Sequence, residues 1–256
     1  MTEFALCFVL FFLLGLAVGS FLNVCIDRLP REQSIIKPPS HCGHCQQRLR
    51  VADLIPLFSY FWLRGRCRYC RASIPRRTLA VELATGLAFP LLYWHFGLTA
   101  LLGVSLVYAS LYLIIFVIDL EHMLVLDKVV YPGMVLALVF SFLPGNIGGL
   151  KAIEGGALGL FITLLPFLIF SGGFGFGDVK LAALVGLSTG FPQMFVALFI
   201  SLVGGGIVAI TLLLSGVKRR KDPIPFAPFF TVAAVLTLLW GKEIIDWYQA
   251  IAWLHR

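Results

Sequence analysis

The chain has 256 residues, of which 59% are hydrophobic and 13% are charged, and its mean hydropathy is +0.94. This composition excludes a soluble globular protein, and the length far exceeds the roughly 20 residues of one membrane-spanning helix. We therefore predict an all-α polytopic membrane protein. The net charge of +7 does not indicate binding to nucleic acid, because the basic residues are concentrated in one loop between apolar segments.

Eight apolar segments predict about eight transmembrane helices. Between the sixth and the seventh we predict a break at 190–192, because one continuous span to Ser215 would move the basic cluster 218–221 to the outside. The first segment has no small-residue cleavage pattern, so we interpret it as a permanent helix. The segments lie near residues 4–25, 79–95, 98–118, 129–143, 152–170, 179–190, 194–216 and 226–252.

The loop between the first two apolar segments holds more than half of the twenty basic residues of the chain. Such an excess is typical of cytosolic loops, and contact with anionic lipid headgroups accompanies it. We predict a first transmembrane helix over 1–25, a small cytosolic domain over 26–78 and a transmembrane domain over 79–256. The basic residues of the loop are Arg28, Arg31, Lys37, Arg48, Arg50, Arg64, Arg66, Arg68, Arg71, Arg76 and Arg77.

Counting membrane crossings from this cytosolic loop predicts that the N-terminus lies outside. The same count places three further loops in the cytosol, at residues 119–128, 171–178 and 217–225. The last of these contains a second basic cluster, at residues 218–221, and therefore falls on the side that its charge favours.

Two Cys-x-x-Cys pairs stand in the basic loop, Cys42 with Cys45 and Cys67 with Cys70. Each pair places two thiolates on one tight turn, and two such turns complete the closed tetrahedral arrangement of structural zinc. Disulfides are the alternative, but they require an oxidising compartment and conflict with the cytosolic placement. We therefore predict a zinc ion held by the four cysteines, with two neighbouring histidines as alternative ligands. Four thiolates leave no open position for catalysis.

A glycine-dense segment, residues 171–180, lies between two long apolar segments and contains Asp178. Aspartate is costly at membrane depth, so its presence here indicates a functional site. The glycines, among them Gly175 and Gly177, allow the backbone to approach a bound chain closely. The structural alternative is that Asp178 caps the helix predicted over 179–190. This helix would cover only about 18 Å of a hydrocarbon core of roughly 30 Å, which places Asp178 below the membrane surface.

A second aspartate, Asp119, follows the third apolar segment and lies, by the crossing count, at the same membrane face as Asp178. Two carboxylates that face each other in a partly dry site share a proton, so that one acts as base on a water molecule and the other as acid. We predict this aspartic-peptidase pair. The structural alternative for Asp119 is a helix-end residue that reaches water or pairs with Lys128 or Lys180. Asp127 is the rival for the second catalytic carboxylate.

Several short motifs follow one another over residues 15–190: Gly19-Ser20-Phe21-Leu22-Asn23-Val24, Arg28-Leu29-Pro30, Cys42-x-x-Cys45, Ile55-Pro56, Gly65-Arg66-Cys67-x-x-Cys70, Glu82, the acidic segment 119–127 and Gly175-x-Gly177-Asp178. In this order and spacing they resemble the type IV prepilin leader peptidases. The resemblance implies an inner-membrane aspartic endopeptidase of the Gly-x-Gly-Asp type, with Asp119 and Asp178 as catalytic residues. Gly175, Gly177 and Lys180 are then expected in or beside the loop that receives the substrate, over residues 172–177.

The resemblance also implies partners and cofactors. Substrates in that family are prepilins or the pseudopilins of type II secretion, cut after a glycine where a short basic leader meets the hydrophobic N-terminal helix. Many members also N-methylate the new N-terminal residue with S-adenosylmethionine, and the cysteine-rich loop marks this bifunctional form. We thus expect structural zinc, S-adenosylmethionine as methyl donor, and location in the bacterial inner membrane. The residues assign neither a methyl-donor site nor an oligomeric state.

Two other functions fit parts of the sequence. A transporter would use the carboxylates as a proton relay, but it predicts inverted sequence halves and acids near the bilayer midplane, and neither pattern is found. A zinc-binding membrane scaffold without catalysis leaves the two carboxylates at one membrane face unexplained.

Overall fold

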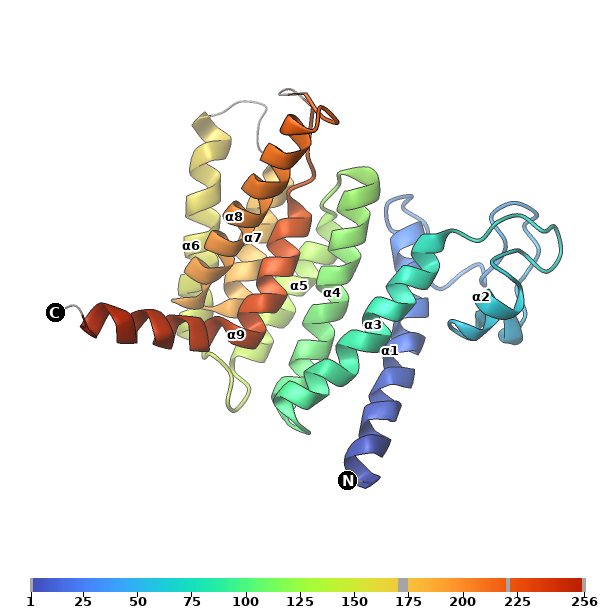
Figure 1. Cartoon of the computed structure of the whole chain (residues 1–256), viewed down its shortest axis with the longest axis horizontal. Coiled ribbons are helices and arrows are strands. Elements are labelled where there is room, and N and C mark those ends of the chain that lie inside the picture. The colour runs from blue at the N-terminus through green and yellow to red at the C-terminus, as the bar shows by residue number, and fades with distance from the viewer. Residues whose placement is uncertain (1, 170–174, 220–221, 255–256) are drawn as a thin grey trace. The chain divides into compact units, whose positions relative to one another are not determined.

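The computed structural model describes residues 2–169, 175–219 and 222–254. These residues form helices and irregular loops, with two isolated β-bridges and no strand (Figure 1). The fold is thus all-helical, as predicted. The elements are α1 (Thr2–Arg28), η1 (Val51–Leu54), α2 (Phe58–Trp62), α3 (Arg76–Phe96), α4 (Ala100–His122), α5 (Asp127–Ser141), α6 (Gly149–Ile169), α7 (Phe176–Thr189), α8 (Gln193–Leu214) and α9 (Ala227–Leu254).

Each of the eight predicted apolar segments corresponds to a helix, but the count of eight membrane spans is not confirmed. Among the described residues, six helices are long and apolar enough to cross a membrane, namely α1, α3, α4, α6, α8 and α9. Helices α5 and α7 have 15 and 14 residues. At 1.5 Å per residue, α7 extends only about 21 Å, less than the roughly 30 Å of a hydrocarbon core.

The chain divides into two compact units at residues 114 and 115, within α4. In the first unit, α1 and α3 pack side by side. Gly15 and Gly19 allow this contact, because a Cβ on either would overlap atoms of Thr85 in α3. Small residues four positions apart permit such close helix packing in membranes. The segment between α1 and α3 is joined to α3 by the buried Glu82, whose Oε2 accepts a hydrogen bond of 2.9 Å from the Leu57 amide.

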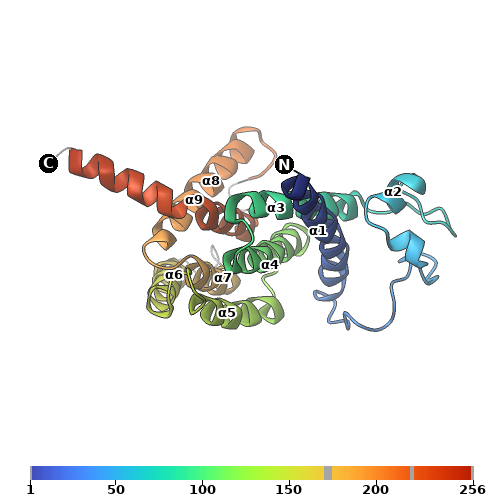
Figure 2. The ribbon, with the colours of Figure 1, turned by 90° about the horizontal axis from the view of Figure 1, so that it is seen from below.

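The second unit is built around α7, which contacts α5, α6, α8 and α9 (Figure 2). Most of the residues of α7 after Lys180 are buried. Gly155 of α6 and Gly186 of α7 bring these two backbones together, since a Cβ on either glycine would overlap the backbone of the other helix. A helix held this closely on several sides is a rigid support for the residues at its ends.

The predicted break between α7 and α8 is confirmed. Helix α7 ends at Thr189, and Gly190 adopts a φ of +74°, the left-handed conformation that commonly ends helices. The Phe191 amide then donates to the carbonyl of Lys151 in α6. As a result α8 runs back toward the end of the unit at which α7 begins, and α4 also ends there (Figure 1).

Candidate functional site

Asp119 lies in the last turn of α4 and is 4% exposed. Its Oδ2 accepts a hydrogen bond of 3.2 Å from the amide of Ala227, the first residue of α9. The first amides of a helix have no partner within the helix, and they favour a negatively charged acceptor. Asp119 therefore caps α9 from a neighbouring helix, and this contact fixes the direction of its carboxylate.

Asp178 is the third residue of α7 and is partly buried. The predicted start of this helix at Val179 is wrong, because α7 begins at Phe176. The structural alternative for Asp178, an N-cap, is wrong as well, since Gly175 occupies that position. The Asp178 carboxylate interacts with the backbone of Gly175, in the manner of an acidic residue that reaches back to the N-cap. The first turn of α7 thus positions the carboxylate.

The two aspartates, 59 positions apart in the sequence, come close enough for direct electrostatic repulsion between their carboxylates. Helix α7 also contacts α9, whose first amide holds Asp119. Two like charges in a partly buried site do not both ionise easily and tend to share one proton. Such a pair has the groups needed for one base and one acid.

Gly177 and Lys180 connect α7 with the acidic segment after Asp119. A Cβ on Gly177 would lie 2.8 Å from the Cβ of Val125, so this position requires glycine for close contact. Lys180 Nζ lies 2.6 Å from Asp127 Oδ1 and 4.8 Å from the ring centre of Phe176. Asp127 is therefore neutralised by Lys180, which favours Asp119 as the partner of Asp178.

The predicted substrate loop is only partly described, because residues 172–174 lie outside the described residues. Of the residues expected there, Gly175 caps α7, Gly177 contacts the acidic segment, and Lys180 forms the ion pair with Asp127. Their contact with a substrate stays a prediction. In the basic cluster at 218–221, the last two residues also lie outside the described part of the chain.

The four cysteines of the basic loop converge as predicted. The Sγ atoms of Cys42, Cys45, Cys67 and Cys70 all lie within 4.8 Å of one another, and those of Cys42 and Cys70 are 3.8 Å apart. A tetrahedron with Zn–S bonds of about 2.3 Å has S–S edges of roughly 3.8 Å, so the cluster has the size of a zinc site. His41 is not among these groups; its Nδ1 lies 3.0 Å from the carbonyl of Pro39.

Two matching turns produce the cluster. In each turn the amide of the first cysteine donates to a carbonyl five residues later, and an antiparallel bridge closes the turn, between His41 and Arg48 and between Arg66 and Ser73. A hydrogen bond from the Cys45 backbone is the largest influence that lowers the pKa of the Cys42 thiol, to about 6. In the same cluster the Ala72 backbone alone would lower the pKa of the Cys70 thiol, but burial and the bonds to the other thiols outweigh it and raise the pKa to about 11. The thiols thus titrate together as one group.

An ion pair ties the second turn to η1. Arg68 lies 2.7 Å from Asp53, whose side chain is nearly inaccessible and also accepts a hydrogen bond from the Arg50 amide. Burial alone would raise the pKa of Asp53, but the bonds from Arg68 and Arg50 outweigh it, so the pKa lies below its usual value. Asp53 is therefore ionised at neutral pH and holds η1 against the cysteine cluster.

Sequence reasoning missed two hydrogen bonds that backbone amides donate to buried carboxylates, one at Asp119 and one at Glu82. The Ala227 amide is a backbone group, and the prolines at 223, 225 and 228 signal only a fixed turn around the start of the last helix. The Leu57 amide, which donates to Glu82, has no side-chain pattern at all. In the structure Glu82 thereby anchors the loop to α3.

The described residues define a multi-pass membrane protein with paired carboxylates at one end of its second unit and a cluster of four cysteines in a loop of its first. The chain belongs to the type IV leader peptidase family. The family model described as "Type IV leader peptidase family" matches residues 106–210, and that described as "Bacterial Peptidase A24 N-terminal domain" matches residues 13–96.

Relatives of the same name cover almost the whole chain. The prepilin leader peptidase/N-methyltransferase of Stutzerimonas stutzeri is 34% identical over 93% of this chain and 92% of its own length. The proteins of that name from Bacillus subtilis and Pseudomonas aeruginosa are each 32% identical, over 94% and 97% of this chain and 97% and 94% of their own. No solved structure matches the chain. These comparisons give no support to a transporter.

Proposed function

We propose that this protein is a membrane aspartic endopeptidase that removes the basic leader from prepilins or pseudopilins and then N-methylates the new N-terminal residue. The observation that carries the peptidase is the convergence of Asp119 and Asp178, which interact electrostatically although they come from different helices. The names of the relatives, prepilin leader peptidase/N-methyltransferase, support both activities.

The proposed reaction uses a water molecule between the two carboxylates. The ionised carboxylate takes a proton from the water as its oxygen attacks the scissile carbonyl carbon, and the protonated partner gives its proton to the carbonyl oxygen. When the tetrahedral intermediate collapses, the C–N bond breaks and the leaving amine takes up a proton. The Ala227 amide keeps Asp119 oriented during these steps.

The placement of the pair fits a membrane-inserted substrate. We propose that the basic loop between α1 and α3 lies in the cytosol, which puts the carboxylates at the cytosolic face. A basic leader then stays in the cytosol while the apolar helix of the substrate inserts beside the enzyme. The scissile bond between these two parts is thereby delivered to the depth of the carboxylates.

The two implied cofactors differ in how well the described residues fit them. The four-cysteine cluster has the ligands and size of a structural zinc site, and we propose that zinc there stabilises the loop. For S-adenosylmethionine the described residues contain no strand, and hence no glycine-rich strand–turn–helix site. We assign no residue to the methyl donor.

The test is incubation of the purified protein in proteoliposomes with a synthetic prepilin, with and without S-adenosylmethionine, followed by mass analysis. The prepilin carries a short basic leader, a glycine, a phenylalanine and about 20 apolar residues. We expect cleavage after the glycine, and a further methyl group only with the methyl donor.

Substitutions of the aspartates test the assignment. Asp119→Asn and Asp178→Asn should each abolish cleavage, because each removes a group that must accept or donate a proton. Asp127→Asn is the matched control and should retain cleavage within about tenfold of the unaltered protein, since Asp127 is held by Lys180. Cleavage by the first two variants would contradict the mechanism.

A further inference from the structure

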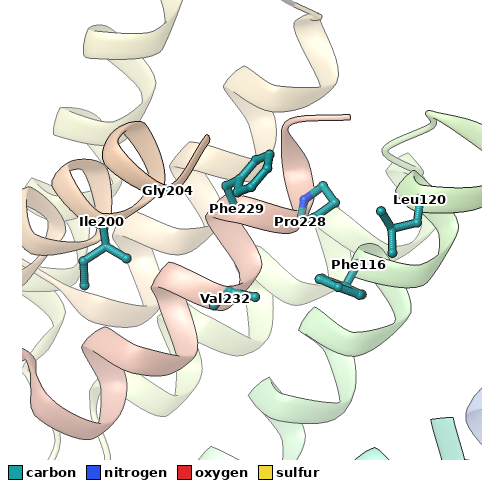
Figure 3. A pocket seen from close by; sticks show the side chains of 7 residues that line it. All are labelled: Phe116, Leu120, Ile200, Gly204, Pro228, Phe229 and Val232. Atoms are coloured by element: carbon teal, nitrogen blue, oxygen red, sulfur yellow. The ribbon is translucent and has the colours of Figure 1, made fainter. Parts of the chain in front are cut away.

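An apolar groove lies beside Asp119 in the second unit (Figure 3). Three helices contribute its walls, and its volume is about 370 Å³. Every lining residue is apolar, so an occupant must itself be apolar. The lining residues are Phe116 and Leu120 of α4, Ile200 and Gly204 of α8, and Pro228, Phe229 and Val232 of α9.

The lining forms two layers. Leu120, Gly204 and Pro228 lie at one level, and Phe116, Ile200 and Val232 lie at the other (Figure 3). On each helix the two levels are four residues apart, which corresponds to a groove length of about 6 Å along the helices. An apolar helix aligned with the groove would present side chains with the same four-residue spacing.

Two residues of the groove are sequence neighbours of the contact between Asp119 and Ala227. Leu120 directly follows Asp119, and Pro228 directly follows Ala227, whose amide donates to Asp119. The layer of Leu120, Gly204 and Pro228 is therefore the one nearer to Asp119 in the sequence of α4 and α9. Helix α9 begins beside Asp119 and runs away from it. The second layer, with Val232, therefore lies about one helical turn farther from Asp119 than the first, and we call it the deep layer.

Gly204 leaves room in the groove for a closely packed occupant. A Cβ on Gly204 would meet only the Phe229 ring, at the ordinary distance of 3.8 Å, so the packing of this chain does not require glycine there. A glycine within a helix costs up to about 1 kcal/mol relative to alanine. In membranes such small residues let a second helix approach closely.

We propose that this groove binds the first two turns of the hydrophobic helix of the substrate, just after the scissile bond. The inference rests on the proposed function and specifies its substrate-binding surface. A helix seated here would have its N-terminal end at Asp119, where the bond must be presented. Lipid acyl chains are the competing occupant, and they require no ordered register.

Filling the groove gives the first test. Gly204→Leu places a side chain into the groove. Gly206→Leu on the same helix is the matched control, because Gly206 does not line the groove and a Cβ there meets nothing within 4 Å. With the synthetic prepilin we expect Gly204→Leu to raise KM at least about tenfold, equivalent to about 1.4 kcal/mol. Gly206→Leu should change KM by less than about twofold. Equal effects of the two variants would overturn the proposal.

Photocrosslinking tests the register and does not depend on those variants. Val232→p-benzoylphenylalanine lies in the deep layer, and Leu202→p-benzoylphenylalanine on exposed α8 surface outside the groove is its control. In an Asp178→Asn background, which keeps the substrate intact, we expect crosslinks from position 232 to the second turn of the substrate helix. Equal crosslinking from position 202, or lipid adducts alone, would overturn the proposal. Failure of the unaltered protein to cleave the prepilin would instead refute the proposed function.

Discussion

Gly177 is the position at which one added methyl group tests the geometry of the carboxylate pair most directly. A Cβ there would lie 2.8 Å from the Cβ of Val125, in the segment that follows Asp119. Carbon atoms pack best at about 3.5–4.0 Å, so Gly177→Ala requires a separation of roughly 0.7–1.2 Å between the two segments. The segments carry Asp178 and Asp119, and their separation moves the carboxylates apart.

A misplacement of about 1 Å at catalytic groups reduces turnover on the order of 100-fold. We expect Gly177→Ala to lower kcat for the synthetic prepilin by about this factor, which corresponds to about 2.7 kcal/mol in the activation barrier. The KM should change less than kcat, because neither Gly177 nor Val125 lines the groove. A time course of cleavage in proteoliposomes, quantified by mass analysis, gives both constants.

Two further variants make the reasoning refutable. Gly206→Ala adds the same methyl group where nothing lies within 4 Å, and it should leave kcat unchanged. Val125→Gly in the Gly177→Ala protein removes the colliding atom and should restore part of the lost turnover. If Gly177→Ala alone keeps kcat within about twofold, the close contact does not position the carboxylates.

Three other substitutions probe the first unit. Cys67→Ser should lower the bound zinc measured by mass spectrometry and speed proteolysis within the basic loop, because a thiolate ligand is lost. Arg71 has a φ of +62°, a backbone conformation that glycine adopts without steric cost, so Arg71→Gly should slow that proteolysis and stabilise the loop by about 1 kcal/mol. Arg71→Ala keeps a Cβ and should give no such gain. Glu82→Leu removes the acceptor of the Leu57 amide and should cost about 1–3 kcal/mol of loop stability, so hydrogen exchange around Leu57 should become faster. Glu82→Gln keeps an acceptor oxygen and should retain the protection.

The helices and the cysteine cluster could be predicted because their signals are local or come in matched pairs. Each apolar segment gave a helix, and the two Cys-x-x-Cys turns together supply four thiols, the full ligand set of one structural zinc site. The start of α7 differs from the prediction by three residues for a physical reason. Gly175 and Gly177 favour a loop by propensity, but Gly177 is helical because its close contact with Val125 outweighs that preference.

The partners of the carboxylates could not be predicted to the same degree. The sequence allows Lys180 to pair with Asp119, but it pairs with Asp127 instead, since the choice depends on how α5 and α7 face each other. The hydrogen bond from Ala227 to Asp119 joins positions 108 residues apart and uses a backbone amide, for which no residue type is selected. Pairing across helices therefore had to come from the structure.

The shortness of α7 follows from its place in the second unit. A helix of about 21 Å would leave lipid in contact with polar backbone at its ends if it stood alone in the bilayer. Helices α5, α6, α8 and α9 contact α7, so its length need not match the hydrocarbon thickness. Its first turn can then lie inside the membrane boundary while neighbouring protein supplies partners for its backbone. Asp178 on that turn is partly exposed, so in the proposed reaction its carboxylate would be held by the helix and still be open to a water molecule.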